Sequence, residues 1–254
     1  MFFPISDDDR SLDRPAYVTY VLVGLNIVLF AVQLSNPNFT YGYSVVPQEI
    51  STGRDLVEPI AITNGQMSIE IPQTRGPNPI WLTLFTAMFM HGGVAHISGN
   101  MLYLWIFGDN VEHRFGAVRF LIFYLVAGLV ATASQIVVDP NGVLPILGAS
   151  GAIAGIMGAY MVLFPYNRVN AVLFFNVVSV PAVVVLGMWI VTQLFSGYGS
   201  LFQSQTGGVA YLAHIGGFFA GAAAGLIARS RMCQEPDSLL RRNYQQDPRA
   251  RRIW

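Results

Sequence analysis

Residues 148–160 read GASGAIAGIMGAY, an apolar stretch in which Ser150 stands between Gly148-Ala149 and Gly151. Gly155 follows Gly151 by four residues, so an α-helix would bring both glycines to one flank. Small residues at such steps allow membrane helices to approach each other backbone to backbone. This stretch therefore predicts a helix that begins with a serine and packs closely against a neighbour.

A second apolar stretch has the same spacing of small residues. Residues 209–228 read VAYLAHIGGFFAGAAAGLIA, with His214 followed by Gly217 and Gly221. Two glycine-flanked helices, one with a serine and one with a histidine, can bring a nucleophile and a base together. The two stretches therefore predict a paired serine and histidine.

The composition is that of a membrane protein. The chain has 254 residues, of which 53% are hydrophobic and 11% are charged. Charged residues make up roughly 25% of a typical soluble domain, so most of this chain is expected in a lipid bilayer. The formal net charge is zero, which gives no indication of nucleic-acid binding. One cysteine excludes an internal disulfide and a metal site built from several thiolates.

Six apolar segments are expected to cross the bilayer, which takes about 20 residues in a helix. A further apolar segment at residues 81–90 is too short to cross and is expected to be re-entrant or interfacial. The expected fold class is an all-α polytopic membrane protein, a six-helix bundle with a long first loop at residues 36–93. Within that loop, residues 65–73 alternate weakly and predict a short strand. The six expected spans are residues 17–35, 94–111, 117–138, 150–165, 169–195 (with a kink at Pro181) and 209–228.

The expected organisation is an N-terminal segment at 1–16, a membrane domain at 17–228 and a tail at 229–254. The first span lacks the features of a cleavable signal peptide. Six crossings place both termini on one side, and only Arg54 and Arg75 among the arginines would lie on the other side. Because positive charge marks the cytoplasmic side, both termini are expected to be cytoplasmic.

Four polar residues are expected at one depth, a short way below the outer surface. They are Ser150, His214, and the pair His96 and Asn100, which share a helix face because they are four residues apart. Polar residues inside membranes usually face a cavity or one another. His96 and Asn100 could donate hydrogen bonds to a developing oxyanion, together with the N–H of Ser150 at its helix N-terminus.

Each of these residues also has a structural interpretation. His96 and Asn100 could join helices by hydrogen bonds, Ser150 could be a helix cap, and His214 could bond to a backbone carbonyl. Their common depth favours the catalytic interpretation. No acidic residue is expected at that depth, so a Ser–His dyad is favoured over a triad.

No metal site is expected. His91 and His96 are five residues apart, which is not the spacing of a zinc-binding helix, and carboxylates are distant. Residues 108–116, GDNVEHRFG, are expected to be structural, with Glu112 and Arg114 satisfying each other and nearby backbone ends.

Four motifs in this order resemble the rhomboid family of intramembrane serine proteases. The resemblance covers about residues 81–228, and implies that Ser150 is the nucleophile and His214 the general base. It also implies that His96 and Asn100 complete the oxyanion hole, without a cofactor. The motifs are HGGVAHISGN (91–100), GDNVEHRFG (108–116) in the pattern GxxxExRxG, GASG (148–151) and AHIGGFFAG (213–221). The structural residues of these motifs are His91, Gly108, Glu112, Arg114, Gly116, Gly148, Gly151, Gly155, Gly217 and Gly221.

Two features depart from the family pattern. The family often has Trp-Arg in the first loop, whereas this chain reads Ile80-Trp81-Leu82-Thr83. Some bacterial members stack a tyrosine, four residues after the serine, on the histidine, whereas this chain has Ala154. His214 is therefore expected to be held by another group.

The resemblance implies an endopeptidase that cleaves transmembrane segments of membrane proteins through an acyl-enzyme. The six-span form is similar to the minimal prokaryotic type, which implies a bacterial cytoplasmic membrane; no oligomeric state is predicted. The fifth span and the loop at 196–208 are the expected substrate gate. One alternative is a non-proteolytic relative, but such proteins lose the serine or the histidine. Another is a transporter, but no duplicated half is visible.

Overall fold

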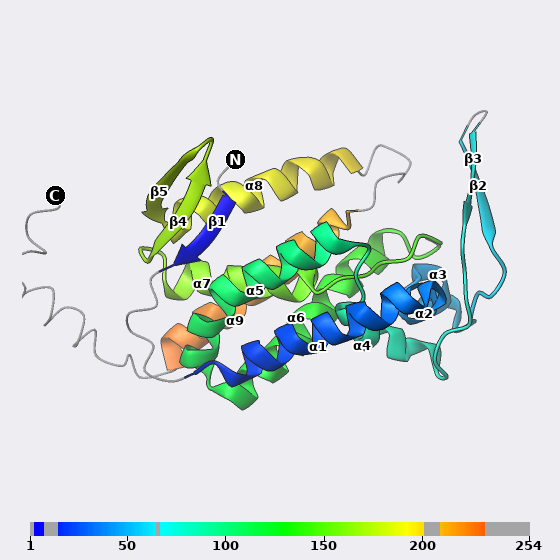
Figure 1. The fold of residues 1–254 in the computed structure, drawn as a ribbon, viewed down its shortest axis with the longest axis horizontal. Coiled ribbons are helices and arrows are strands. Elements are labelled where there is room, and N and C mark those ends of the chain that lie inside the picture. The colour runs from blue at the N-terminus through cyan, green and yellow to red at the C-terminus, as the bar shows by residue number, and fades with distance from the viewer. Residues whose placement is uncertain (1–2, 8–14, 65–66, 201–208, 232–254) are drawn as a thin grey trace, which may run out of the picture.

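The computed structural model describes residues 3–7, 15–64, 67–200 and 209–231 (Figure 1). Helices dominate the described part of the chain. In chain order, its elements are β1 (Phe3–Asp7), α1 (Tyr17–Ser35), α2 (Pro37–Tyr43), α3 (Pro47–Thr52), β2 (Ile60–Asn64), β3 (Met67–Ile71), η1 (Ile80–Leu82), α4 (Thr83–Thr86), η2 (Ala87–Phe89), α5 (Val94–Phe115), α6 (Ala117–Val138), α7 (Ser150–Leu163), β4 (Arg168–Leu173), β5 (Asn176–Pro181), α8 (Ala182–Ser200) and α9 (Tyr211–Arg231).

The helices α5, α6, α8 and α9 surround the short helix α7, and α1 packs against α5. Residues Gly151 to Tyr160 of α7 are all buried, and α7 packs against α5, α6, α8 and α9. This burial on every side is possible because its sequence is apolar and rich in small residues, with no face that favours water. The helix that begins with Ser150 therefore lies at the centre of the bundle.

The helix lengths support several membrane crossings. In the described residues, α1, α6, α8 and α9 are long and apolar enough to cross a membrane. The segments Ile80–Phe89 and Val94–Phe115 meet the same test as a pair but bend by 78° at their junction, as expected for a re-entrant segment at 81–90. Helix α7 has 14 residues, fewer than the roughly 20 that a full crossing takes. The multi-pass helical fold is confirmed, and six full crossings stay a prediction.

The expected start of the fifth span at residue 169 is wrong. Strands β4 and β5 form a hairpin there, Arg168 pairs with Pro181, and β1 adds to β4 antiparallel. The segment is rich in valine, which favours strands. Pro181 ends β5 and directly precedes α8, so it does not kink that helix. The fold is thus not purely helical, and 232–254 of the expected tail lie outside the described residues.

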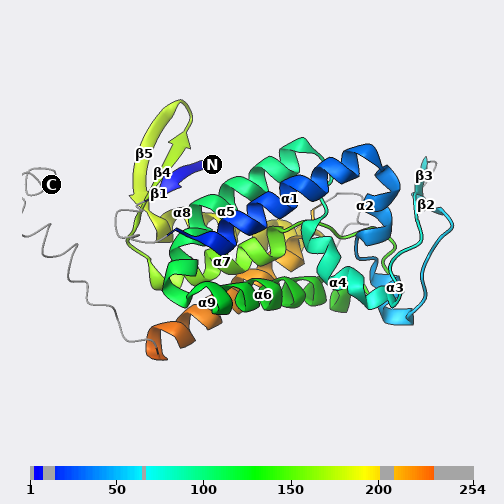
Figure 2. The same cartoon turned by 60° about the horizontal axis from the view of Figure 1, so that its bottom comes forward.

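The two small sheets lie at opposite ends of the bundle (Figures 1 and 2). The sheet β1–β4–β5 lies at the end where α9 finishes, and the hairpin β2–β3 extends from the first loop at the other end. Strand β3 at Met67–Ile71 confirms the short strand predicted within 65–73. The first loop is therefore a structured region rather than a bare connection.

Helices α7 and α9 touch backbone to backbone, as their glycine spacing predicts. A Cβ atom on Gly217 would collide with the carbonyl oxygen of Gly151, and one on Gly221 with that of Gly155. Only glycine permits this approach, and it fixes the distance between the two helices. Because Gly151 follows Ser150 and Gly217 lies one turn after His214, the contact also fixes the two predicted reactive residues relative to each other.

The motif at 108–116 joins α5 to the start of α1. The buried carboxylate of Glu112 accepts hydrogen bonds from the backbone N–H groups of Val18 (2.9 Å) and Thr19 (2.7 Å) and from the Thr19 hydroxyl (2.8 Å). These N–H groups have no acceptor within their own helix, and a carboxylate there also interacts favourably with the helix dipole. The expectation that Glu112 binds backbone ends is correct, but in the described part of the chain its hydrogen-bond partners are Val18 and Thr19 and not the expected Arg114.

Local structure explains why two positions of the same motif are glycine. A Cβ on Gly108 would lie 3.1 Å from the Thr19 side chain, so the glycine lets α1 approach α5. Gly116 ends α5 with a φ of 78°, and its N–H donates to the Glu112 carbonyl at 2.7 Å. A positive φ of this kind favours glycine.

The first loop is hydrogen-bonded to the segment that enters α7. Val45 and Ile146 exchange backbone hydrogen bonds of 2.9 and 2.7 Å, and Gln48 donates its N–H to the Gly142 carbonyl at 3.0 Å. The Gln73 side chain donates to the Val143 carbonyl at 2.8 Å. These bonds order the residues just before Ser150.

Candidate active site

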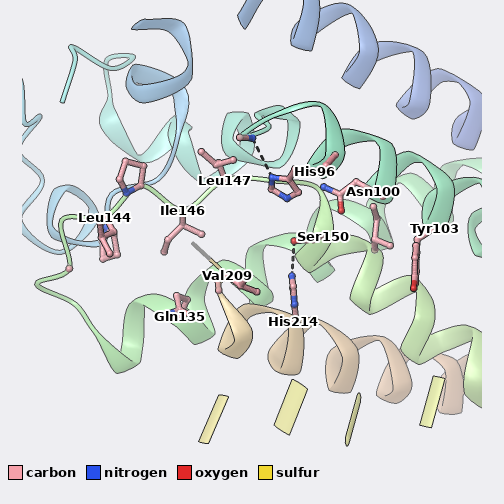
Figure 3. A pocket seen from close by; sticks show the side chains of 18 of the residues that line it. His96, Asn100, Tyr103, Gln135, Leu144, Ile146, Leu147, Ser150, Val209 and His214 are labelled. Carbon is pink, nitrogen blue, oxygen red and sulfur yellow. Dashed lines mark hydrogen bonds between the residues drawn. The ribbon is translucent and has the colours of Figure 1, made fainter. Parts of the chain in front are cut away.

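A cavity of about 860 Å³ opens at the N-terminal ends of α5, α7 and α9. Ser150, His214, His96 and Asn100 all line it, so the structure brings together the four residues predicted for the site. Figure 3 shows the Ser150 hydroxyl between His214 on one side and His96 with Asn100 on the other. A concave, mostly apolar site with a few convergent polar groups is typical of ligand binding.

Ser150 and His214 are in direct contact. The Ser150 Oγ lies 2.8 Å from the His214 Nε2 (Figure 3). Ser150 is the first residue of α7 and His214 lies in the first turn of α9. The glycine contacts between these helices begin at the next residue of α7 and at the next turn of α9. The same small residues that pack the helices therefore hold the serine and the histidine at hydrogen-bond distance.

The other ring nitrogen of His214 contacts a residue that sequence reasoning missed. The His214 Nδ1 lies 2.8 Å from the Gln193 Oε1 of α8. The Trp189 ring, one turn earlier on α8, lies 5.8 Å from the His214 ring at 38°. Trp189 and Gln193 are four residues apart in an apolar segment, and this spacing was the signal in the sequence that they share a helix face. Ala154, the position of the family's stacking tyrosine, carries no side chain that could do this.

His96 has one nitrogen directed into the site. Its Nδ1 accepts the Gly92 N–H at 3.3 Å, so the hydrogen of a neutral imidazole is on Nε2. A Cβ built on Gly148 would lie 2.9 Å from this Nε2. The N–H of His96 thus points to the backbone just before Ser150.

Asn100 presents an unused donor to the same place. It is 8% exposed, and its Nδ2 finds no hydrogen-bond acceptor in the described part of the chain. A Cβ on Gly148 would lie 3.6 Å from this nitrogen. A buried donor without an acceptor costs about 1–3 kcal/mol, so this nitrogen is free to donate a hydrogen bond to a molecule bound in the cavity.

Position 148 requires glycine for two reasons: its backbone conformation and the lack of room for a side chain. Its φ of +119° is rarely adopted by residues with side chains, and a Cβ would meet the His96 ring at 2.9 Å. Its N–H donates to the Ala87 carbonyl at 2.8 Å, which ties the site to the segment Ile80–Phe89. The glycine thus lets His96 and Asn100 approach the start of α7.

His91 does not line the cavity. It is buried, and its backbone N–H and carbonyl are both hydrogen-bonded to the Gln33 side chain at 3.0 Å. Its ring packs edge-on against His96 at 5.2 Å. Among the described residues, no group of three or more His, Cys, Asp or Glu side chains could hold a metal ion.

Comparison with known proteins identifies the family. Residues 78–231 match the family model described as the Rhomboid domain. The chain belongs to the rhomboid family. Together with its long apolar helices, this makes it an integral, multi-pass membrane protein.

Named relatives of this rhomboid chain come from bacteria, plants and yeast. It is 32% identical to Rhomboid protease GluP of Bacillus subtilis over 76% of this chain and 36% of that protein. It is 31% identical to RHOMBOID-like protein 1 of Arabidopsis thaliana over 42% of this chain and 27% of that protein. It is 24% identical to Rhomboid protein 1, mitochondrial, of Saccharomyces cerevisiae over 84% of this chain and 53% of that protein. The chain thus spans about a quarter to a half of the length of these relatives.

Proposed function

We propose that this member of the rhomboid family is an intramembrane serine endopeptidase that cleaves transmembrane segments of other membrane proteins. The observation that carries the proposal is the 2.8 Å contact between the Ser150 Oγ and the His214 Nε2 inside a cavity of the bundle. The name of the relative Rhomboid protease GluP supports a protease of this family.

In the proposed reaction, Ser150 is the nucleophile and His214 the general base. As the Ser150 Oγ attacks a peptide carbonyl carbon, the His214 Nε2 takes the hydroxyl proton. The tetrahedral intermediate collapses when the peptide C–N bond breaks, and His214 gives its proton to the leaving amine. Water then attacks the acyl-enzyme by the same route and releases the acid. No cofactor takes part in these steps.

The oxyanion of the intermediate would be held by three donors. They are the His96 Nε2–H, the Asn100 Nδ2–H and the backbone N–H of Ser150, which as the first residue of α7 has no acceptor within its helix. Donors arranged before the reaction stabilise developing charge without reorganisation. The unpaired state of the Asn100 amide supports this role.

The substrate would unwind locally before cleavage. In a helix each carbonyl is bonded to an N–H one turn on and shielded by side chains, so a serine cannot reach it. Small or helix-breaking residues near the cleavage site would lower the cost of unwinding. Helix α8 forms one edge of the bundle in Figure 1, and we propose that it admits the substrate. Residues 201–208 of the expected gate loop lie outside the described residues.

We also propose that both termini are cytoplasmic. The asymmetry of the arginines supports this orientation. In it, β1 and the end of α9 lie at the cytoplasmic end of the bundle, and the cavity opens toward the outer surface. The proposed location is a bacterial cytoplasmic membrane.

Cleavage of a single-span reporter protein by the purified chain in liposomes tests the function. We expect Ser150→Ala and His214→Ala to reduce cleavage to background, and His113→Ala, whose side chain does not line the cavity, to retain it. Equal cleavage by all four proteins would indicate a contaminating protease and overturn the proposal.

A further inference from the structure

We propose that Gln193 is a positioning residue that holds His214 in the protonation state and orientation required by Ser150, so that α8 completes the active site. This inference rests on the proposed function. It explains how the histidine is held in a chain that has Ala154 where some relatives have a stacking tyrosine.

The chemistry of the two side chains sets the proton positions. The Gln193 Oε1 is an amide oxygen, which can only accept a hydrogen bond. Because the Gln193 amide presents this oxygen 2.8 Å from the His214 Nδ1, we assign the hydrogen to the Nδ1. The Nε2 is then left with its lone pair toward the Ser150 hydroxyl, 2.8 Å away. This is the tautomer that a general base needs, and the opposite tautomer could not accept the serine proton.

The burial of Gln193 supports a dedicated role. Gln193 is 9% exposed, whereas its neighbours Val191 and Leu194 are 48% and 43% exposed, as expected for side chains that face lipid. An amide within an apolar span is unfavourable unless it finds a hydrogen-bond partner. The partner is the His214 ring.

Helix α8 contacts the imidazole from two directions. Gln193 bonds its Nδ1 edge, and the Trp189 ring lies beside it at 5.8 Å. Trp189 is itself packed 6.0 Å from Phe218 of α9. From the other elements, Ser150 of α7 contacts the ring, and the other titratable side chains that line the cavity are His96 and Tyr103 of α5 and Asp139, which follows α6. The restraint on the Nδ1 edge therefore comes from α8.

This arrangement couples substrate entry to catalysis. If α8 moves outward to admit a substrate, His214 loses both the Gln193 bond and the Trp189 contact. The base is then free to rotate or to change tautomer, and it regains the productive state when α8 packs back. The dyad would thus be complete only in the closed state of the bundle.

The first test compares cleavage kinetics of Gln193→Leu and Gln193→Glu. Leucine has a similar size but no acceptor, so kcat should fall by about 10- to 100-fold, a part of what a general base contributes, with KM unchanged. Glutamate keeps an acceptor oxygen at the same reach and should restore most of the loss. Thr192→Val is the control, because within the described residues the Thr192 hydroxyl bonds to the Trp189 carbonyl of its own helix and not to His214.

The second test reads the tautomer directly by nitrogen NMR. The chain has four histidines, so histidine-selective ¹⁵N labelling gives few imidazole signals, and His214→Ala assigns those of His214. We expect a protonated Nδ1 in the wild type and in Gln193→Glu, and loss of that single state in Gln193→Leu. Gln193→Met provides a second variant without a strong acceptor if the leucine variant does not fold.

These readouts separate the inference from the proposed function. An unchanged kcat and an unchanged tautomer in a folded Gln193→Leu or Gln193→Met would overturn the inference while leaving the protease intact. If the wild type cleaves nothing, the function fails, but the NMR signals still decide whether Gln193 fixes the Nδ1–H tautomer.

Discussion

At the scale of single residues, Asn100 combines a cost in stability with a proposed benefit in catalysis. Its buried Nδ2 has no acceptor among the described residues, although it lies beside the start of α7. Asn100→Leu should lower kcat by about 10²- to 10³-fold, as removal of one oxyanion donor does elsewhere. The same change should leave the midpoint of thermal unfolding equal or higher, because it removes an unpaired polar group.

The test measures cleavage and thermal unfolding of the same preparations in detergent micelles. Ser98→Ala, an exposed neighbour on α5 that does not line the cavity, is the control for activity. A lower unfolding midpoint for Asn100→Leu with wild-type cleavage would show that Asn100 stabilises the fold instead of the oxyanion.

The sequence was sufficient to predict that Ser150, His214, His96 and Asn100 come together, as they do in the cavity, but not that Gln193 joins them at His214. Ser150, His214, His96 and Asn100 stand out because polar side chains are rare in apolar spans, and a common depth could be derived from topology alone. Gln193 is equally polar, but its role depends on how α8 is rotated about its axis. That rotation follows from tertiary packing, which a single sequence does not contain.

At the scale of elements, the contacts between glycines of α7 and α9 predict that adding one methyl group there lowers the stability of the protein. A Cβ on Gly221 would collide with the Gly155 carbonyl oxygen, so Gly221→Ala should destabilise the protein by about 1–3 kcal/mol, as overpacking does. Gly187→Ala in α8 is the matched control, because no atom lies within 4 Å of its built Cβ. There, alanine should be neutral or stabilising, since it favours helix more than glycine does.

Thermal unfolding in micelles, together with reporter cleavage, measures this difference. Equal midpoints for the two alanine variants would contradict backbone contact between α7 and α9. Because the same contact positions Ser150 against His214, we expect cleavage to fall along with stability in Gly221→Ala only.

The fifth helix shows where hydropathy alone misleads. Residues 169–195 form one apolar run, and length favoured a single helix. The first part is instead a hairpin, in which Val169 pairs with Val180 and Asn170 with Ser179 across the two strands. Strand pairing with β1, distant in sequence, stabilises this hairpin, and no local pattern reveals that partner. By contrast, the expected limits of α6 agree with the structure, because Gly116 directly precedes the helix and Pro140 lies just after its end.

At the scale of the whole molecule, part of the first loop, including helix α3, forms a cap: it packs against the segment that directly precedes α7. Helix α3 donates hydrogen bonds from the Gln48 N–H to the Gly142 carbonyl and from the Ser51 hydroxyl to the Pro140 carbonyl. The sequence indicated a long loop with a short strand but not these contacts, because they join segments about ninety residues apart. The segment that precedes α7 forms part of the cavity wall. Its conformation therefore depends on the folding of the first loop.

A buried carboxyl group in this cap predicts that stability depends on pH. Glu49 of α3 is 4% exposed. Burial, with a smaller contribution from the nearby Asp55, raises its pKa from 4.5 to about 7, although the Leu56 N–H bond acts in the opposite direction. Between these two pH values the folded protein holds a proton that the unfolded chain releases. The contribution of Glu49 to the free energy of unfolding is therefore fully present at acidic pH and is lost as the pH rises through about 7.

Glu49→Gln tests this prediction, because glutamine keeps the acceptor for the Leu56 N–H, which Glu49 binds at 2.8 Å, but cannot ionise. Unfolding midpoints of the variant and the wild type should coincide near pH 4, below the ordinary pKa of the carboxyl, whereas near pH 8 the variant should unfold a few degrees higher. Glu58→Gln, at an exposed position of the same loop, is the matched control for the loss of one carboxylate. All other titrating groups are the same in the two proteins. Parallel plots of unfolding midpoint against pH for Glu49→Gln and the wild type would therefore contradict the raised pKa of Glu49. The stability of the cap would then not depend on a protonated Glu49.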